Sequence, residues 1–213
     1  MTEVSILAVD THWIIVNKPA GLLAVPGKGP DKQDCLSARI QAQYADALVV
    51  HRLDMATSGL MVMARGIAAQ RVLSAAFAQR LVHKRYTAVV AGVLAPHFAQ
   101  WQVIDLPIQV DWPNRPLRKI DTLQGKASMT RVMALETDAV HGRTRVSLEP
   151  VTGRSHQLRV HMLAIGHPML GDALYAPESV CAMAPRLLLH ATELSLPHPE
   201  HGNSVAFASA VPF

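Results

Sequence analysis

The 213-residue chain is 50% hydrophobic and 17% charged, which excludes intrinsic disorder and suits one domain or one catalytic unit with two lobes. A net charge of +4, with fourteen Arg and six Lys, favours a nucleic-acid partner, although an ordinary basic enzyme has the same balance. The cysteines form no pair motif, no apolar run reaches the roughly 20 residues that span a membrane, and the N-terminus shows no secretory signal. We therefore expect a cytoplasmic protein.

Apolar periodicity predicts an α+β fold with a central, largely antiparallel sheet flanked by a few helices. In chain order, we expect strands at residues 6–10 and 13–18, a helix at 35–44, strands at 47–50 and 60–64, a helix at 67–81, and strands at 83–90, 128–135, 143–149, 155–162, 187–190 and 194–196. The apolar face of the second helix is expected to consist of Val72, Leu73, Ala76, Phe77 and Leu81.

Residues 19–30 are dense in Pro and Gly, which predicts a surface loop. Lys18 and Lys32 flank this segment and Lys28 lies within it, so it could contact phosphates. A solvated loop without a partner is equally consistent with the sequence.

A second polar, Pro-rich segment covers residues 96–127. It contains the string WPNRPLRK, in which Arg115, Arg118 and Lys119 lie close to Trp112. We interpret it either as an RNA-contacting insertion or as an exposed basic loop without a partner.

The most informative stretch is residues 51–59, which read HRLDMATSG between two apolar runs. A Thr-Ser-Gly turn between strands predicts a hairpin-like reversal, and it places Asp54 where a strand ends and the chain bends. A carboxylate there can face a cleft, although an Asp that merely shapes the turn explains the local sequence as well. The whole string resembles the signature of the RluA-type pseudouridine synthases, in which this aspartate is catalytic.

Further segments resemble other motifs of this family. Residues 84–86 read KRY, and the resemblance places Tyr86 in the active site; the alternative is a strand aromatic with its hydroxyl at the surface. Residues 166–175 and 189–191 also resemble family segments, and we interpret them as a turn and a strand that support the site.

The string TGRSHQLRVH at residues 152–161 resembles the family's arginine motif. If this segment is a strand, Gln157, Arg159 and His161 share one face. The resemblance pairs Arg159 with Asp54. An opposite charge within a few Å lowers an Asp pKa by about 1 to 3 units, which would keep Asp54 ionised.

The resemblance implies a pseudouridine synthase catalytic fold over residues 1–213, with an active-site cleft across the sheet and no separate N-terminal RNA-binding domain. The implied reaction isomerises uridines of 23S rRNA, of a tRNA anticodon stem-loop or of both, without a cofactor. Asp54 would act as nucleophile or base, Tyr86 would pack on the uracil, and Arg52 would fill the gap left by the extruded uridine. The remaining residues expected to bind RNA are His51, Arg154, Arg115, Arg118 and Lys119.

No metal is expected, because the eleven histidines show no zinc-binding spacing. On a strand, His156 and His161 would point to opposite faces. Two alternatives to the isomerase stay open. One is a non-catalytic RNA-binding or ribosome-assembly protein; the other is a hydrolase that uses Ser58 or the histidines, although the sequence offers Ser58 no evident base. No heptad or large apolar surface stripe is visible, so we expect a monomer.

Overall fold

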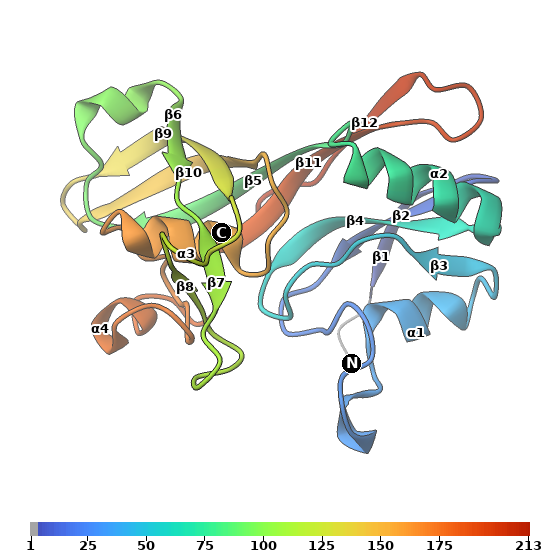
Figure 1. The fold of residues 1–213 in the computed structure, drawn as a ribbon, viewed down its shortest axis with the longest axis horizontal. Coiled ribbons are helices and arrows are strands. Elements are labelled where there is room, and N and C mark those ends of the chain that lie inside the picture. The colour runs from blue at the N-terminus through green and yellow to red at the C-terminus, as the bar shows by residue number, and fades with distance from the viewer. Residues whose placement is uncertain (1–3) are drawn as a thin grey trace. The chain divides into compact units, whose positions relative to one another are not determined.

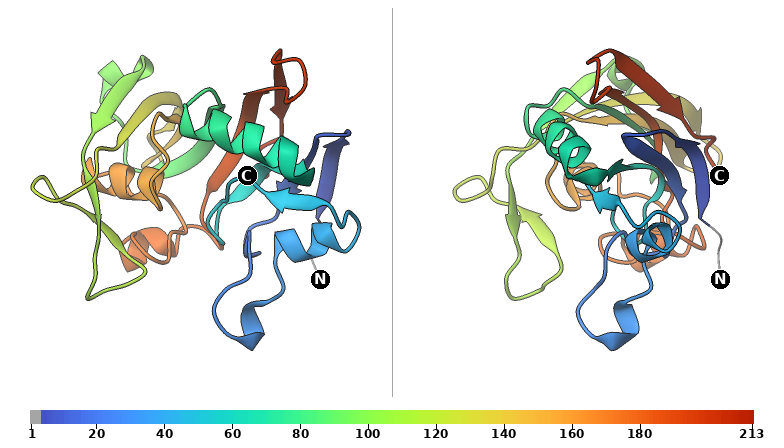
Figure 2. Two further views of the ribbon diagram at one scale, coloured as in Figure 1. Left: turned by 45° about the vertical axis from the view of Figure 1, so that its right-hand side comes forward. Right: turned by 90° about the vertical axis from the view of Figure 1, so that its right-hand side faces the viewer.

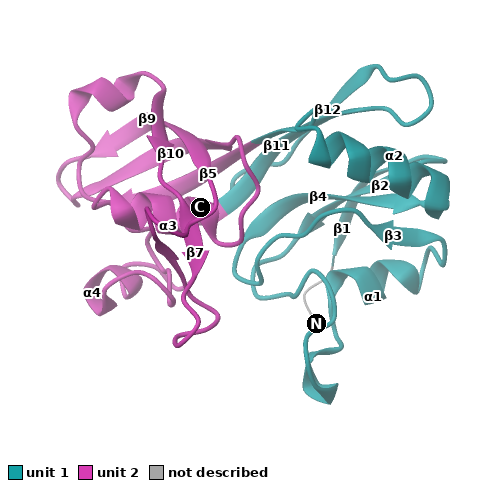
Figure 3. Cartoon of the chain, viewed as in Figure 1, with its two compact units in different colours: residues 1–84, 190–212 teal, residues 85–189, 213 magenta. Residues whose placement is uncertain are grey.

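The computed structural model describes residues 4–213 (Figure 1). Residues 1–3, which belong to the N-terminal stretch searched for a secretory signal, lie outside the described residues. The chain divides into two compact units, unit 1 with residues 1–84 and 190–212 and unit 2 with residues 85–189 and 213 (Figure 3). None of the helices within residues 4–213 is long and apolar enough to span a bilayer.

Unit 1 is built on a sheet in which the strands lie in the order β1-β2-β4-β11, with β3 paired to β4 and β12 paired to β11. All these pairings are antiparallel except that of β4 with β11. The strands are β1 (Ser5–Val9), β2 (Trp13–Lys18), β3 (Ala47–Val49), β4 (Ser58–Arg65), β11 (Leu189–Pro197) and β12 (Ser204–Ala208). The predicted reversal is confirmed, because Val49 of β3 lies opposite Met63 of β4.

The helices of unit 1 are η1 (Pro30–Lys32), α1 (Leu36–Gln41) and α2 (Gly66–Ala78). Helix α2 packs against β3 and β4 and buries Ala69, Leu73 and Ala76. The expected apolar face was partly wrong, because Val72 and Leu81 are exposed. Small alanines fill the interface with the sheet instead, since they let the helix approach it closely.

Unit 2 contains the antiparallel strand order β5-β10-β9-β6 and a separate hairpin, β7-β8. The strands are β5 (His83–Ala91), β6 (Gln102–Asp105), β7 (Ile108–Val110), β8 (Arg118–Ile120), β9 (Met129–Asp138) and β10 (Arg143–Pro150); the helices are η2 (Pro96–Ala99), α3 (Gln157–Ala164) and α4 (Glu178–Cys181). The boundary between the units falls within β5 and at the start of β11.

The segment 96–127, expected as a loop, holds three short strands. Two of them form the β7-β8 hairpin, which extends away from the rest of unit 2 (Figure 2). The WPNRPLRK string runs from its turn into β8, so the basic residues are presented on a projecting element rather than on an unstructured loop.

The expected strand at 155–162 is wrong, because residues 157–164 form helix α3. Six of its eight residues are buried, among them Gln157, Arg159 and His161. A helix that is buried on nearly all sides lacks the 3.6-residue hydrophobic period of an amphipathic helix. The alternation of polar and apolar residues in this segment therefore predicted a strand. On the helix, Gln157 and His161 lie one turn apart on the same face, and Arg159 points elsewhere.

Candidate active site

The loop that carries Asp54, residues 50–57, joins β3 to β4. The main-chain carbonyl of Asp54 accepts a hydrogen bond from the Thr57 N–H at 3.1 Å, which closes a turn. Arg52 is exposed, Leu53 is buried and Asp54 is partly exposed, so Leu53 anchors the loop between the two charged residues. Residues 50–57 contain no strand, so Arg52 and Asp54 are positioned by the loop and its turn.

A buried lysine holds this loop from one side. The ammonium of Lys18, which is completely buried, donates to the carbonyls of Pro19 and Leu22 at 2.8 Å and of Met55 at 3.1 Å. The N–H of Gly21 donates to the same Met55 carbonyl at 2.8 Å. Lys18 therefore fastens the end of β2 to the residue next to Asp54, and its ammonium is buried rather than presented to solvent.

The ring of His51 fastens the other end of the loop. Its Nε2 accepts a hydrogen bond from the Val62 N–H of β4 at 3.1 Å, so Nε2 carries no proton. The ring also stacks on Phe77 of α2, with centroids 4.5 Å apart. Burial, helped by the positive charge of Lys84, lowers the pKa of His51 to about 3. This neutral ring has a structural role and adds no positive charge to an RNA-binding surface.

Gly59 lets β4 approach β11 closely. Its φ is +113°, and a Cβ at this position would overlap the backbone of Ala191. Strand β4 therefore needs glycine directly after the turn, both for the backbone angle and for the space. The glycine of the HRLDMATSG string is thus explained by packing within unit 1.

The hydrolase alternative has a base that the sequence could not reveal. Ser58 Oγ lies 2.8 Å from His190 Nδ1, and His190 Nε2 lies 3.0 Å from Ser209 Oγ. Both Ser58 and His190 are buried. A nucleophile has to be reachable by its substrate, so this hydrogen-bonded chain fits a structural link between β4 and β11 and not a hydrolytic centre.

In unit 2, Arg159 forms a buried ion pair with Asp172. Nε of Arg159 donates to Oδ2 at 2.8 Å and Nη2 donates to Oδ1 at 2.5 Å. The guanidinium also lies 4.9 Å from the ring centroid of Tyr175. Sequence reasoning placed Asp172 in a supporting turn and did not foresee this pairing, because the two residues come from different segments.

Other polar side chains of the 152–161 string form hydrogen bonds inside unit 2. The Gln157 carbonyl oxygen accepts from the Thr152 hydroxyl at 2.7 Å, and its amide nitrogen donates to Thr130 Oγ1 at 3.0 Å. His161 Nδ1 lies 2.9 Å from the same Thr130 hydroxyl, and its Nε2 lies 2.9 Å from the Leu106 carbonyl. This network explains why polar side chains are tolerated inside α3, and it fixes Arg159 through the helix backbone.

Tyr86 lies on β5 opposite Leu148 of β10 and is only 9% exposed. The side chain of Tyr86 is therefore largely buried. Another tyrosine of unit 2, Tyr175, forms polar contacts through its hydroxyl. The oxygen accepts a hydrogen bond from the Arg118 N–H at 2.9 Å and lies 2.6 Å from His156 Nδ1. Burial raises the pKa of Tyr175, so it is a neutral phenol.

Three of the six residues predicted to bind RNA lie on the β7-β8 hairpin. Arg115 stacks on Trp112, with the guanidinium carbon 3.9 Å from the ring centroid, and both are exposed. Arg118 donates to the carbonyls of its own hairpin, whereas Lys119 is exposed. Arg154 is exposed too, and its Nε donates to the Ala127 carbonyl at 3.3 Å.

Comparisons with known proteins decide the family. A family model described as RNA pseudouridylate synthase matches residues 12–164. The chain belongs to this family. It is accordingly an isomerase that converts uridine in RNA to pseudouridine, as the sequence predicted.

The similar proteins match it over most of their length. The dual-specificity RNA pseudouridine synthase RluA of Escherichia coli K12 is 49% identical over 208 residues, which cover 98% of this chain and 93% of that protein. The protein of the same name from Yersinia pestis is 48% identical and is covered to 99%. Among solved structures, human RNA pseudouridylate synthase domain containing 1 has a TM-score of 0.81 and 29% identity, with 99% of this chain and 84% of that chain covered.

Proposed function

We propose that this enzyme modifies a uridine of 23S rRNA, a uridine of a tRNA anticodon stem-loop, or both, with Asp54 as its catalytic carboxylate. The dual-specificity name of relatives that match nearly the whole chain supports two RNA substrates. The observation that carries the role of Asp54 is its place in a partly exposed loop that Lys18 and His51 hold from both sides. A carboxylate on a rigid support can meet a reacting atom reproducibly.

The reaction needs no cofactor. The bond between N1 of uracil and C1′ of the ribose breaks, the uracil turns, and a bond between C5 and C1′ forms. The proton on C5 leaves and N1 gains one, so the product is an isomer of the substrate. Asp54 either forms a covalent intermediate with the sugar or with the uracil ring, or removes a proton from the sugar; covalent catalysis would divide one difficult step into two.

Arg159 and Tyr86 are the proposed companions of Asp54. Arg159 would keep Asp54 ionised and oriented, and its guanidinium is a rigid donor because Asp172 holds it at two points. Tyr86 would pack against the uracil and accept the C5 proton. This role is compatible with its burial on β5, where few solvent molecules could compete.

RNA has to present the uridine outside its stack, which costs a few kcal/mol. Stacking on an aromatic ring or guanidinium returns about 1–3 kcal/mol, so the two contributions nearly balance. We assign Arg52 to the vacated space in the RNA because it is exposed two residues from Asp54. Arg115, Arg118, Lys119 and Arg154 are proposed to bind phosphates. We also propose a monomer, a single catalytic unit over residues 1–213 and a cytoplasmic location.

Release of tritium from C5 tests the proposal. The protein is incubated with [5-³H]uridine-labelled 23S rRNA fragments and with tRNA anticodon stem-loops. Release from both substrates by the wild type, loss of release in Asp54→Asn and unchanged RNA binding by that variant are the expected results. Tight binding without release would favour an RNA-binding protein, and full activity of Asp54→Asn would remove Asp54 from the mechanism.

A further inference from the structure

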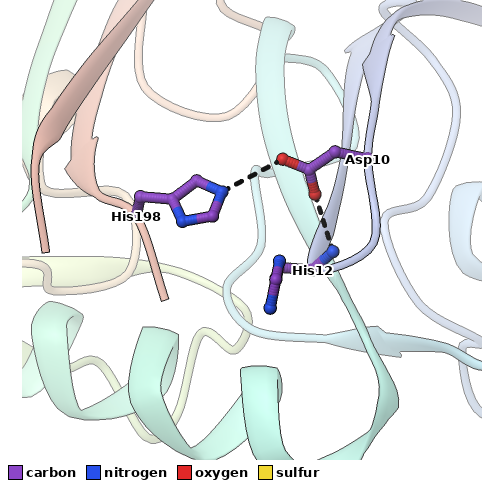
Figure 4. Close-up of side chains that lie close together, drawn as sticks. All are labelled: Asp10, His12 and His198. Atoms are coloured by element: carbon purple, nitrogen blue, oxygen red, sulfur yellow. Dashed lines mark hydrogen bonds and ion pairs between the residues drawn. The ribbon is translucent and has the colours of Figure 1, made fainter. Parts of the chain in front are cut away.

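Two turns of unit 1 bring together three side chains that can coordinate a metal ion. Asp10 and His12 lie in the turn between β1 and β2, and His198 follows β11. Their ligand atoms all lie within 4.8 Å of one another, and Asp10 Oδ2 is 3.2 Å from His198 Nε2 (Figure 4). His198 is 188 residues from Asp10 along the chain, so no spacing in the sequence could reveal the cluster.

The carboxylate of Asp10 is held in place by its own turn. Oδ1 accepts the N–H of His12 at 2.6 Å and the N–H of Trp13 at 2.9 Å, while Oδ2 faces His198. One oxygen of the carboxylate is therefore held by the turn, and the other faces the cluster.

The ring of His198 is held as well. It packs edge-on against Trp13, with centroids 4.7 Å apart, and stacks on His201 at 3.9 Å. Its side chain is only 10% exposed. The third donor, His12, is partly exposed; its Nδ1 lies 2.9 Å from the Thr11 hydroxyl, and its ring meets that of His198 edge-on with centroids 5.0 Å apart.

We propose that Asp10, His12 and His198 bind one divalent transition-metal ion such as Zn²⁺ or Co²⁺. Two imidazole nitrogens and one carboxylate oxygen form a donor set that these ions favour. A four-coordinate ion about 2.0–2.2 Å from its ligands keeps neighbouring ligand atoms about 3.3–3.5 Å apart, and the Asp10–His198 distance already matches this value. Because no ligand atom of the three lies more than 4.8 Å from another, a shift of at most about 1.5 Å brings them to this spacing.

A fourth ligand is within reach. Glu200 Oε2 lies 4.0 Å from His12 Nε2 and its side chain is exposed. Without metal, Nδ1 of His198 accepts the N–H of Glu200 at 3.2 Å. Coordination of the ion through Nε2 would move the ring proton to Nδ1, so no net proton would be released. The hydrogen bond from Glu200 would then be lost, and the Glu200 segment could turn toward the ion.

The bound ion would link the first and the last hairpin of unit 1, β1-β2 and β11-β12. None of its ligands belongs to the proposed catalytic or RNA-binding residues. The ion would therefore stabilise the folded chain without taking part in the isomerisation, and its binding should raise the melting temperature.

Cobalt titration of the full chain without a polyhistidine tag tests the site. The visible absorption of Co²⁺ and the heat of Zn²⁺ binding should both show one saturable equivalent per chain. Asp10→Asn keeps an oxygen that accepts the two backbone N–H bonds but removes the charge, so it should weaken binding at least about tenfold, as should His12→Ala and His198→Ala.

The matched control is His141→Ala. His141 is an exposed ring paired with Asp138 at 2.8 Å, a two-residue arrangement outside the cluster. This variant should bind Co²⁺ like the wild type. Retained circular dichroism and retained pseudouridine formation by the three cluster variants would show that they fold. A wild type without saturable binding, or folded cluster variants with wild-type affinity, would overturn the proposal.

Discussion

Arg159 and Asp172 form a two-point ion pair in which the side chains are only 3% and 1% exposed. The carboxylate also accepts the backbone N–H groups of Leu174 and Tyr175, at 3.0 and 3.2 Å. Asp172 therefore holds the guanidinium of Arg159 in a fixed orientation within unit 2.

Replacing Asp172 with Asn should destabilise the protein by about 3–5 kcal/mol, because it leaves a buried guanidinium without its counter-charge. Urea unfolding monitored by circular dichroism measures the loss. Asp138→Asn is the matched control, since this carboxylate pairs with exposed Arg143 and His141. Its effect should be much smaller. Equal losses in both variants would show that burial of the Arg159 pair has no special importance.

Acidification should destabilise the wild type through His51. The pKa of His51 is lowered to about 3 in the folded protein and returns to about 6.5 on unfolding, so the unfolded chain binds the proton first. Stability is therefore present above pH 6.5 and declines as the pH falls from 6.5 toward 3, by a few kcal/mol in all. His51→Gln should flatten this part of the urea-midpoint profile, whereas the exposed-site variant His141→Gln should not. Parallel wild-type and His51→Gln profiles would refute the assignment.

Lys18→Met should lower both stability and turnover. The change keeps the aliphatic volume but removes the ammonium donor from the carbonyls of Pro19, Leu22 and Met55, although Met55 keeps the Gly21 N–H; this costs about 2–4 kcal/mol. A looser Asp54 loop should reduce kcat in the tritium assay while RNA affinity stays within about threefold. Lys28→Met, in the exposed part of the neighbouring loop, should change neither quantity. A fully active Lys18→Met enzyme would mean that the loop needs no such support.

Gly59→Ala should be far more damaging than Gly66→Ala. Both glycines have a positive φ, +113° and +75°, but a Cβ at Gly66 meets nothing within 4 Å. Gly66→Ala should therefore show backbone strain alone, about 1–2 kcal/mol, and Gly59→Ala should add the clash with Ala191. Thermal melting of the two variants compares them. Similar melting temperatures would contradict the close approach of β4 and β11.

Removing Arg115 or Lys119 should weaken RNA binding and reduce the salt slope of log Kd by about one for each phosphate that the side chain neutralises. Arg143→Ala removes an exposed arginine that is already paired with Asp138, so its salt slope should stay at the wild-type value. Fluorescence anisotropy with a labelled stem-loop across a salt series gives these slopes. Unchanged slopes in both hairpin variants would exclude the β7-β8 hairpin from the RNA interface.

The sequence alone determined the family, the reversal around Asp54, helix α2 and most strands. Hydrophobic periodicity and a nine-residue motif can both be recognised within a short stretch of chain. It failed at α3, where burial on nearly all sides removed the amphipathic signal that distinguishes a helix.

Only the tertiary structure decided the partners of the polar side chains. Lys18 fastens the Asp54 loop, Arg159 pairs with Asp172, and Asp10 meets His198 across 188 residues of chain. Each of these interactions joins segments that become neighbours only when the sheets form. A buried charge must find its partner in space, and the order of residues along the chain does not specify which one it finds.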